Sequence, residues 1–126
     1  MSNTFGTNGS LLKAYYDLIL EMLLEEDLKK INPYFLRVVF YLSTNKFGNN
    51  QQQDVMEFLS ILLNNLHEDV NSVIDKPYME IEDQKENEKE SDVSERLWNC
   101  HKLRENSIIV DLFQGHIYHY FSIIII

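Results

Sequence analysis

The sequence is short of cysteine, proline and glycine, with one, two and four of these residues among its 126. The single cysteine, Cys100, excludes an internal disulfide framework and fits a reducing compartment. The few glycines form no glycine-rich phosphate loop, and no serine-nucleophile motif is present. Nucleotide-binding and serine-hydrolase functions are therefore not indicated.

Basic residues and long apolar runs are also scarce. Only 11 lysines and arginines face 20 acids, which gives a formal net charge of −9. This balance argues against nucleic acid as a partner, because phosphate binding needs a basic surplus, and it suits a cationic partner. No run approaches the roughly 18 apolar residues of a membrane span, and residues 1–6 lack the parts of a signal peptide. We therefore expect a cytoplasmic or nuclear protein without a membrane partner.

Three stretches in the first half of the chain carry apolar residues at helical spacing. Residues 11–24 follow Ser10, a residue type that caps helix N-termini. Residues 34–42 also suit a strand by their β-branched and aromatic content, but Pro33 before them is well tolerated at a helix start, and we predict a helix. The longest helix is predicted from Gln52 to Asn71, with its buried face formed by Val55, Phe58, Leu59, Leu62, Leu63, Leu66 and Val70.

The second half of the chain begins with a change of composition. Residues 80–92 are almost all charged or polar, which predicts a surface linker. A capping-box pattern at Asp92 to Glu95 predicts a helix through Leu103. Residues 106–113 and 116–126 are rich in β-branched residues and predict strands. We expect an α+β fold, mainly α, with a helical part over 1–74, a charged linker over 75–92, and a helix with strands over 93–126.

Asp54 and Glu57 are the most informative polar residues, because they stand at the start of the longest predicted helix. One interpretation is a routine N-terminal cap, since the helix dipole favours negative charge there. The other is a binding site for a cationic group. Spacing within this helix alone favours the cap.

The cysteine and the histidines are weaker candidates for chemistry. Cys100 and His101 are neighbours on a predicted helix and point about 100° apart, so we expect a structural cysteine and no nucleophile–base pair. His116 and His119 fall on opposite faces of a predicted strand, so no metal site is expected. His67 is expected to be a solvated or capping side chain.

Four blocks, in order along the chain, resemble the ubiquitin-specific proteases, which are cysteine deubiquitinases or ubiquitin carboxyl-terminal hydrolases. The resemblance implies a papain-like catalytic domain of thumb, palm and fingers, with this chain as the thumb and the root of the fingers. The blocks are Asn3 with Gly6 and the helix from Leu11 to Met22; Phe47-Gly48 with Gln52-Gln53-Asp54 and Glu57-Phe58-Leu59; Lys76-Pro77-Tyr78; and Trp98 to Gly115.

The resemblance also implies a site and a partner. In the family, the acids of the second block bind the arginine-containing C-terminal tail of ubiquitin, and the matching residues here are Gln53, Asp54 and Glu57. Bonds from a guanidinium to a carboxylate are strong and directional. Ubiquitin and ubiquitinated proteins are thus the expected partners.

The chain departs from the family pattern in three places. The family's cysteine box and histidine box have no counterpart, and residues 119–126 lack the cysteines of a zinc ribbon. The uncharged, β-prone run Ile123 to Ile126 is an aggregation hazard when unpaired, so we interpret it as the end of a chain that stops inside a domain; a buried terminal strand is the alternative. We therefore expect no catalytic residue, metal or cofactor here, and a fragment of a thiol-dependent deubiquitinase that recognises ubiquitin without cutting. A non-catalytic ubiquitin-binding or helical protein-interaction module is the alternative.

Overall fold

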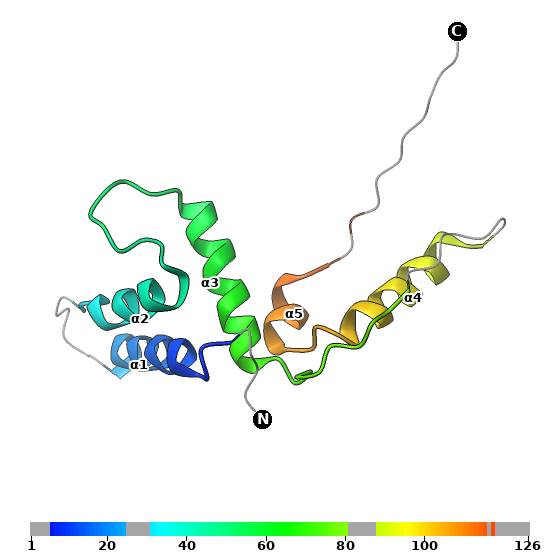
Figure 1. The fold of residues 1–126 in the computed structure, drawn as a ribbon, viewed down its shortest axis with the longest axis horizontal. Coiled ribbons are helices and arrows are strands. Elements are labelled where there is room, and N and C mark those ends of the chain that lie inside the picture. The colour runs from blue at the N-terminus through cyan, green and yellow to red at the C-terminus, as the bar shows by residue number, and fades with distance from the viewer. Residues whose placement is uncertain (1–5, 25–30, 81–87, 116, 118–126) are drawn as a thin grey trace, which may run out of the picture.

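The structure, a computed structural model, describes residues 6–24, 31–80, 88–115 and 117. These residues form helices and no strand, and no helix among them is long and apolar enough to cross a membrane. Figure 1 shows α1 and α2 on one flank of α3, with α5 on the other flank and α4 reaching away. The helices are α1 (Ser10–Leu24), α2 (Tyr34–Thr44), α3 (Val55–Val70), α4 (Glu90–Lys102) and α5 (Ile108–Phe113).

The three helices predicted in the first half are confirmed, with two corrections at their starts. The helix expected from Gln52 to Asn71 runs from Val55 to Val70, after its cap Asp54. Ser10 is the first residue of α1 instead of its cap. The Thr7 hydroxyl accepts a bond from the Leu11 N–H (2.9 Å), and Asp69 of α3 accepts one from the Leu12 N–H (3.1 Å). The orphan donors of α1 are therefore satisfied partly from a distant part of the chain.

The core lies where α1, α2 and α3 meet. Its buried members are Leu11, Phe40, Leu62 and Leu66. The predicted buried face of α3 is correct at Leu62 and Leu66 but wrong at Val55 and Leu59, which are 71% and 44% exposed. In the first turn of α3, Phe58 packs against the core while Val55 is exposed.

An aromatic cluster joins the 45–53 loop to this core. The rings of Phe40, Phe47 and Phe58 lie 5.1 to 5.6 Å apart between centroids, two of the three pairs edge to face. The cluster fixes the loop that leads into α3.

The second half departs further from the prediction. The helix expected from Asp92 begins at Glu90, so the predicted capping box is wrong: Lys89 stands at the cap without a side-chain bond. The strand predicted over 106–113 is also wrong, because these residues contain α5. Ser107 caps α5 by accepting the Val110 N–H (3.3 Å), and Val110 is fully buried, so packing and capping outweigh β-branched propensity. Except for Ile117, the second predicted strand lies outside the described residues.

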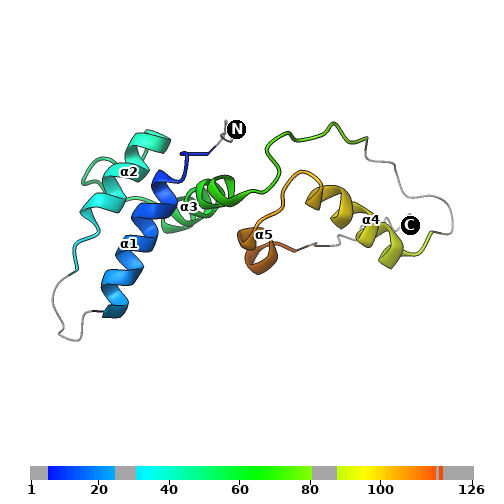
Figure 2. The ribbon, with the colours of Figure 1, turned by 90° about the horizontal axis from the view of Figure 1, so that it is seen from below.

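Figure 2 shows how these pieces are placed around α3. The pair α1 and α2 lies on one side of α3, and α4 and α5 lie on the other. The central helix carries acidic side chains at both ends, Glu57 in its first turn and Glu68 with Asp69 in its last.

Candidate functional site

The N-terminal end of α3 holds the predicted acids. Asp54 is the N-cap, and its Oδ1 accepts bonds from the backbone N–H groups of Met56 (2.7 Å) and Glu57 (3.0 Å). The capping interpretation of Asp54 is thus confirmed. Both bonds converge on one oxygen, and within the described part of the chain Oδ2 keeps its lone pairs for a further donor.

Glu57, in the first turn of α3, pairs with Lys46 from the preceding loop. The Lys46 Nζ lies 2.6 Å from Oε1 of Glu57, and the two side chains are 54% and 48% exposed. Gln53 is held nearby, since its amide donates to Oδ1 of Asn49 (2.9 Å). These residues border a surface hollow of about 590 Å³ lined by Tyr41, Asn45, Lys46, Phe47, Gly48, Asn49, Gln53 and Glu57. The structure thus brings Gln53, Asp54 and Glu57 together at one exposed, polar place.

Backbone geometry fixes the loop that faces these acids. Asn45 and Phe47 both have left-handed φ angles, 56° and 63°. The Asn45 N–H closes α2 on the Tyr41 carbonyl (2.7 Å). Gly48 lies against the Tyr41 ring, where an added Cβ would overlap the ring atoms. A left-handed phenylalanine is uncommon, and its burial in the aromatic cluster offsets that strain.

The C-terminal end of α3 carries acids of a different kind. Asp69 accepts bonds from the Thr7 N–H (2.6 Å), the Thr7 hydroxyl (2.6 Å) and the Gly9 N–H (3.2 Å). Gly6 comes so close that an added Cβ would lie 3.0 Å from Oδ1 of Asp69. Asp69 therefore ties the segment before α1 to α3.

His67 is the residue that the sequence interpretation missed. It was expected to be solvated or capping, but it is 3% exposed. Its Nδ1 lies 2.7 Å from the Ser107 hydroxyl and its Nε2 lies 2.7 Å from Oε2 of Glu105. Asn71 completes the contact, donating to Glu105 (3.0 Å). Because Ser107 and Glu105 follow His67 by 40 and 38 residues, no local pattern signals the group.

Lys76 neutralises the acids beside His67. Its Nζ donates to Glu68 and to both carboxylate oxygens of Glu105, each at 2.9 Å. Burial opposes the charge of Lys76, but the bonds to the two glutamates win and raise its pKa. For Glu105, burial again acts against ionisation, and the bonds from His67 and Lys76 lower its pKa.

These residues form the His67 cluster (His67, Glu68, Asn71, Lys76, Glu105 and Ser107), which resembles two kinds of chemical site. Ligand atoms of His67, Glu68 and Glu105 lie within 4.8 Å of one another, a donor set that zinc accepts. However, the Lys76 ammonium already lies between the two carboxylates. The row from Ser107 through His67 to Glu105 has the order of a serine triad, but the Ser107 hydroxyl is buried and caps α5. The arrangement fits a structural role, in which His67 near the end of α3 holds the segment that leads into α5.

Cys100 lies in α4, as predicted, and is half-buried. His101 is directed elsewhere: its Nε2 lies 2.7 Å from Oε1 of Gln114, and its ring stacks on Trp98 at 5.4 Å. The two residues do not form a pair. His116 and His119 lie outside the described residues.

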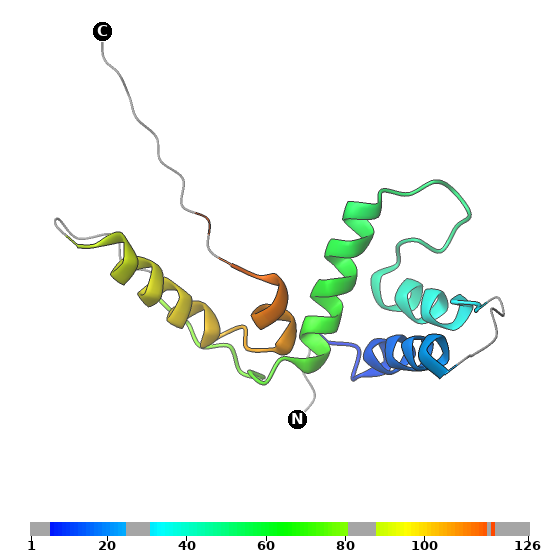
Figure 3. The ribbon, with the colours of Figure 1, turned by 180° about the vertical axis from the view of Figure 1, so that it is seen from behind.

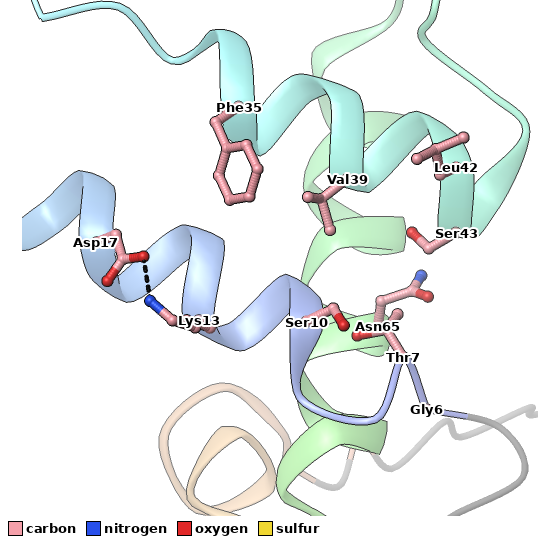
Figure 4. Close-up of a pocket in the computed structure, with 10 residues that line it drawn as sticks. All are labelled: Gly6, Thr7, Ser10, Lys13, Asp17, Phe35, Val39, Leu42, Ser43 and Asn65. Carbon is pink, nitrogen blue, oxygen red and sulfur yellow. Dashed lines mark hydrogen bonds and ion pairs between the residues drawn. The ribbon is translucent and has the colours of Figure 1, made fainter.

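A second hollow lies between α1 and α2 and contains none of the predicted site residues. Figure 4 shows apolar side chains of α2 on one side and the ion pair between Lys13 and Asp17 on the other. Its volume is about 640 Å³, and its lining is Gly6, Thr7, Ser10, Lys13, Asp17, Phe35, Val39, Leu42, Ser43 and Asn65. It offers no convergent acids for a cationic ligand.

Comparison with known proteins identifies the class. The sequence profile of the family described as "Ubiquitin carboxyl-terminal hydrolase" matches residues 2–124. The chain belongs to this family, and the resemblance read from its four blocks is confirmed.

Individual relatives agree. The chain is 38% identical over 116 residues to ubiquitin carboxyl-terminal hydrolase 32 of Homo sapiens, covering 92% of this chain and 7% of that protein. It is 37% identical over 113 residues to ubiquitin carboxyl-terminal hydrolase 9 of Arabidopsis thaliana, covering 90% of this chain and 12% of that protein. The chain thus spans only a small part of the length of these relatives.

Proposed function

We propose that this chain binds the arginine-containing C-terminal tail of ubiquitin through Asp54, Glu57 and Gln53, as the tail-recognition part of a thiol-dependent deubiquitinase. One observation carries the proposal: two carboxylates lie exposed at the start of α3, Asp54 at the cap and Glu57 in the first turn, and Asp54 forms its cap bonds with one oxygen, Oδ1. Membership of the ubiquitin carboxyl-terminal hydrolase family supports ubiquitin as the partner.

The electrostatics of the helix start explain why two acids are needed. The N-terminal end of a helix carries a partial positive charge, which repels a cationic ligand. Asp54 and Glu57 reverse the local sign and offer carboxylate oxygens to guanidinium N–H groups. The Gln53 amide adds a neutral polar contact at the rim of the same hollow.

Hydrolysis needs a thiolate and a base, and we assign neither to these residues. Cys100 lies in α4 with its neighbour His101 turned toward Gln114. In this proposal, residues 1–126 form the thumb and finger root of a papain-like domain, and residues outside them supply the nucleophile and base. Ubiquitinated proteins are then the substrates of the whole domain.

A ubiquitin titration of the isotope-labelled chain, followed by NMR, tests the proposal. Asp54→Asn removes the charge but keeps a good N-cap, because asparagine caps as well as aspartate. Glu57→Gln likewise removes only charge. We expect each variant to weaken binding about tenfold, the value of one charge-assisted hydrogen bond. Ubiquitin without its C-terminal tail is expected to cause no shifts at this site.

A matched control separates a specific site from general acidity. Asp111 is 48% exposed, as Glu57 is, and its carboxylate likewise lies 2.6 Å from a lysine, Lys102. Asp111→Asn is expected to leave binding unchanged, and an equal loss there would contradict a site at α3. Covalent capture of Cys100 by an activity-based ubiquitin probe would contradict its non-catalytic role and support a different enzyme mechanism.

A further inference from the structure

Lys46 occupies a carboxylate of the proposed tail site. Its ammonium lies 2.6 Å from Oε1 of Glu57, whereas Asp54 has no cationic partner among the described residues. We infer that Lys46 is a specificity-determining residue, an internal competitor for Glu57 that makes the site discriminate arginine from lysine in its ligand. The inference rests on the proposed function.

The loop backbone fixes the position from which Lys46 reaches Glu57. The residues on both sides, Asn45 and Phe47, are in the left-handed region, and Phe47 is anchored between Phe40 and Phe58. The Lys46 N–H donates to the Thr44 hydroxyl (3.2 Å). Only the side chain of Lys46 is therefore free to move when a ligand arrives.

The chemistry of the two cations decides the competition. The Lys46 ammonium contacts a single oxygen of Glu57, Oε1. A guanidinium presents a planar fork of N–H groups that engages both oxygens of a carboxylate, so it gains a bond by displacing an ammonium. A ligand ammonium replaces one point charge by another and gains nothing. An exposed pair of this kind is weak, so Lys46 disfavours ammonium ligands relative to guanidinium ligands without preventing ligands from binding.

Two substitutions of Lys46 that are expected to change ubiquitin binding in opposite directions test this inference. Lys46→Met keeps the aliphatic stem and frees Glu57, and is expected to tighten ubiquitin binding roughly two- to fivefold at low ionic strength. Lys46→Arg installs a bidentate competitor and is expected to weaken binding by a similar factor. With synthetic ubiquitin-tail peptides carrying arginine or lysine, the preference for arginine is expected to be smaller in Lys46→Met than in the unaltered chain.

Lys102→Met is the matched control, because it removes an equally short lysine pair at 2.6 Å and changes net charge equally. It is expected to reproduce neither the tighter binding nor the reduced preference. If Lys46→Met and Lys102→Met behave alike while the unaltered chain binds ubiquitin, the role of Lys46 is overturned and tail recognition stands. If neither the unaltered chain nor Lys46→Met binds, both proposals fall.

Discussion

The two ends of α3 carry similar side chains and use them in opposite ways. At the N-terminal end, Asp54 and Glu57 are exposed, and among the described residues their side chains bond only to the adjoining loop and the first turn. At the C-terminal end, His67 and Asp69 bond to segments far away in the sequence. Figure 3 shows the first end standing clear and the second lying between the start of α1 and α5. Polar groups at the second end join distant segments of the fold, whereas those at the first end are exposed and bond only nearby among the described residues.

The position of Asp69 shows how one carboxylate serves two helices. Negative charge is unfavourable at the C-terminal end of a helix, so Asp69 is poorly placed with respect to α3. The same carboxylate accepts bonds at the N-terminal start of α1, where negative charge is favoured. The gain at α1 offsets the cost at α3 and fixes the two helices relative to each other.

The largest effect is expected from Asp69→Ala. It removes the acceptor of four bonds to Thr7, Gly9 and Leu12, and we expect the free energy of unfolding to fall by about 3 kcal/mol. Urea denaturation followed by circular dichroism measures the change. Asp17→Ala, which breaks only an exposed pair with Lys13, is the control and is expected to cost less than about 0.5 kcal/mol. Equal costs would erase the contrast between structural and exposed acids.

A smaller effect is expected from Glu105→Gln, at about 2 kcal/mol, because His67 and Lys76 lose their charged partner. The pKa of Glu105 is lowered on folding, so its stabilising charge is present above the ordinary glutamate range and is lost as pH falls through the folded pKa. The pKa of Lys76 is raised, so its contribution is present below the ordinary lysine range and is lost as pH rises through the folded pKa.

The pH dependence provides the check. The free energy of unfolding, measured by urea denaturation, is expected to be highest at pH values between the folded pKa of Glu105 and the folded pKa of Lys76. Glu105→Gln is expected to reduce the fall in this free energy at acidic pH. An unchanged acidic decline in that variant would assign the loss to other carboxylates.

The smallest effect is expected at the exposed end. Asp54→Ala removes the cap of α3 and is expected to lower the free energy of unfolding by about 1 kcal/mol, while Asp54→Asn is expected to change it little. Thermal unfolding of the two variants measures the difference. A loss in Asp54→Asn as large as in Asp54→Ala would mean that the charge itself stabilises the fold, and would weaken the contrast between the two ends.

The sequence predicted the parts of the molecule that local patterns control. Helical periodicity located α1, α2 and α3, and the cap at Asp54 followed from residue type and position. The predicted strand over 106–113 failed because Val110 and Ile109 pack inward from a helix capped by Ser107, while Ile108 of the same helix stays exposed. His67 was misjudged because its partners come from 38 and 40 residues away, a distance over which spacing carries no signal. The ion pair between Lys46 and Glu57 was likewise not predicted, because it depends on a loop with left-handed φ angles at Asn45 and Phe47.

The stacking of Trp98 on His101 has a practical consequence. Trp98 is the only tryptophan of the sequence, and it lies in α4, on the side of α3 opposite to α1 and α2. Its emission is therefore an optical label for that side alone, whereas circular dichroism averages over all helices. If tryptophan emission and circular dichroism give coincident unfolding curves, the molecule unfolds as one cooperative unit. If the curves separate, the parts on the two sides of α3 unfold independently.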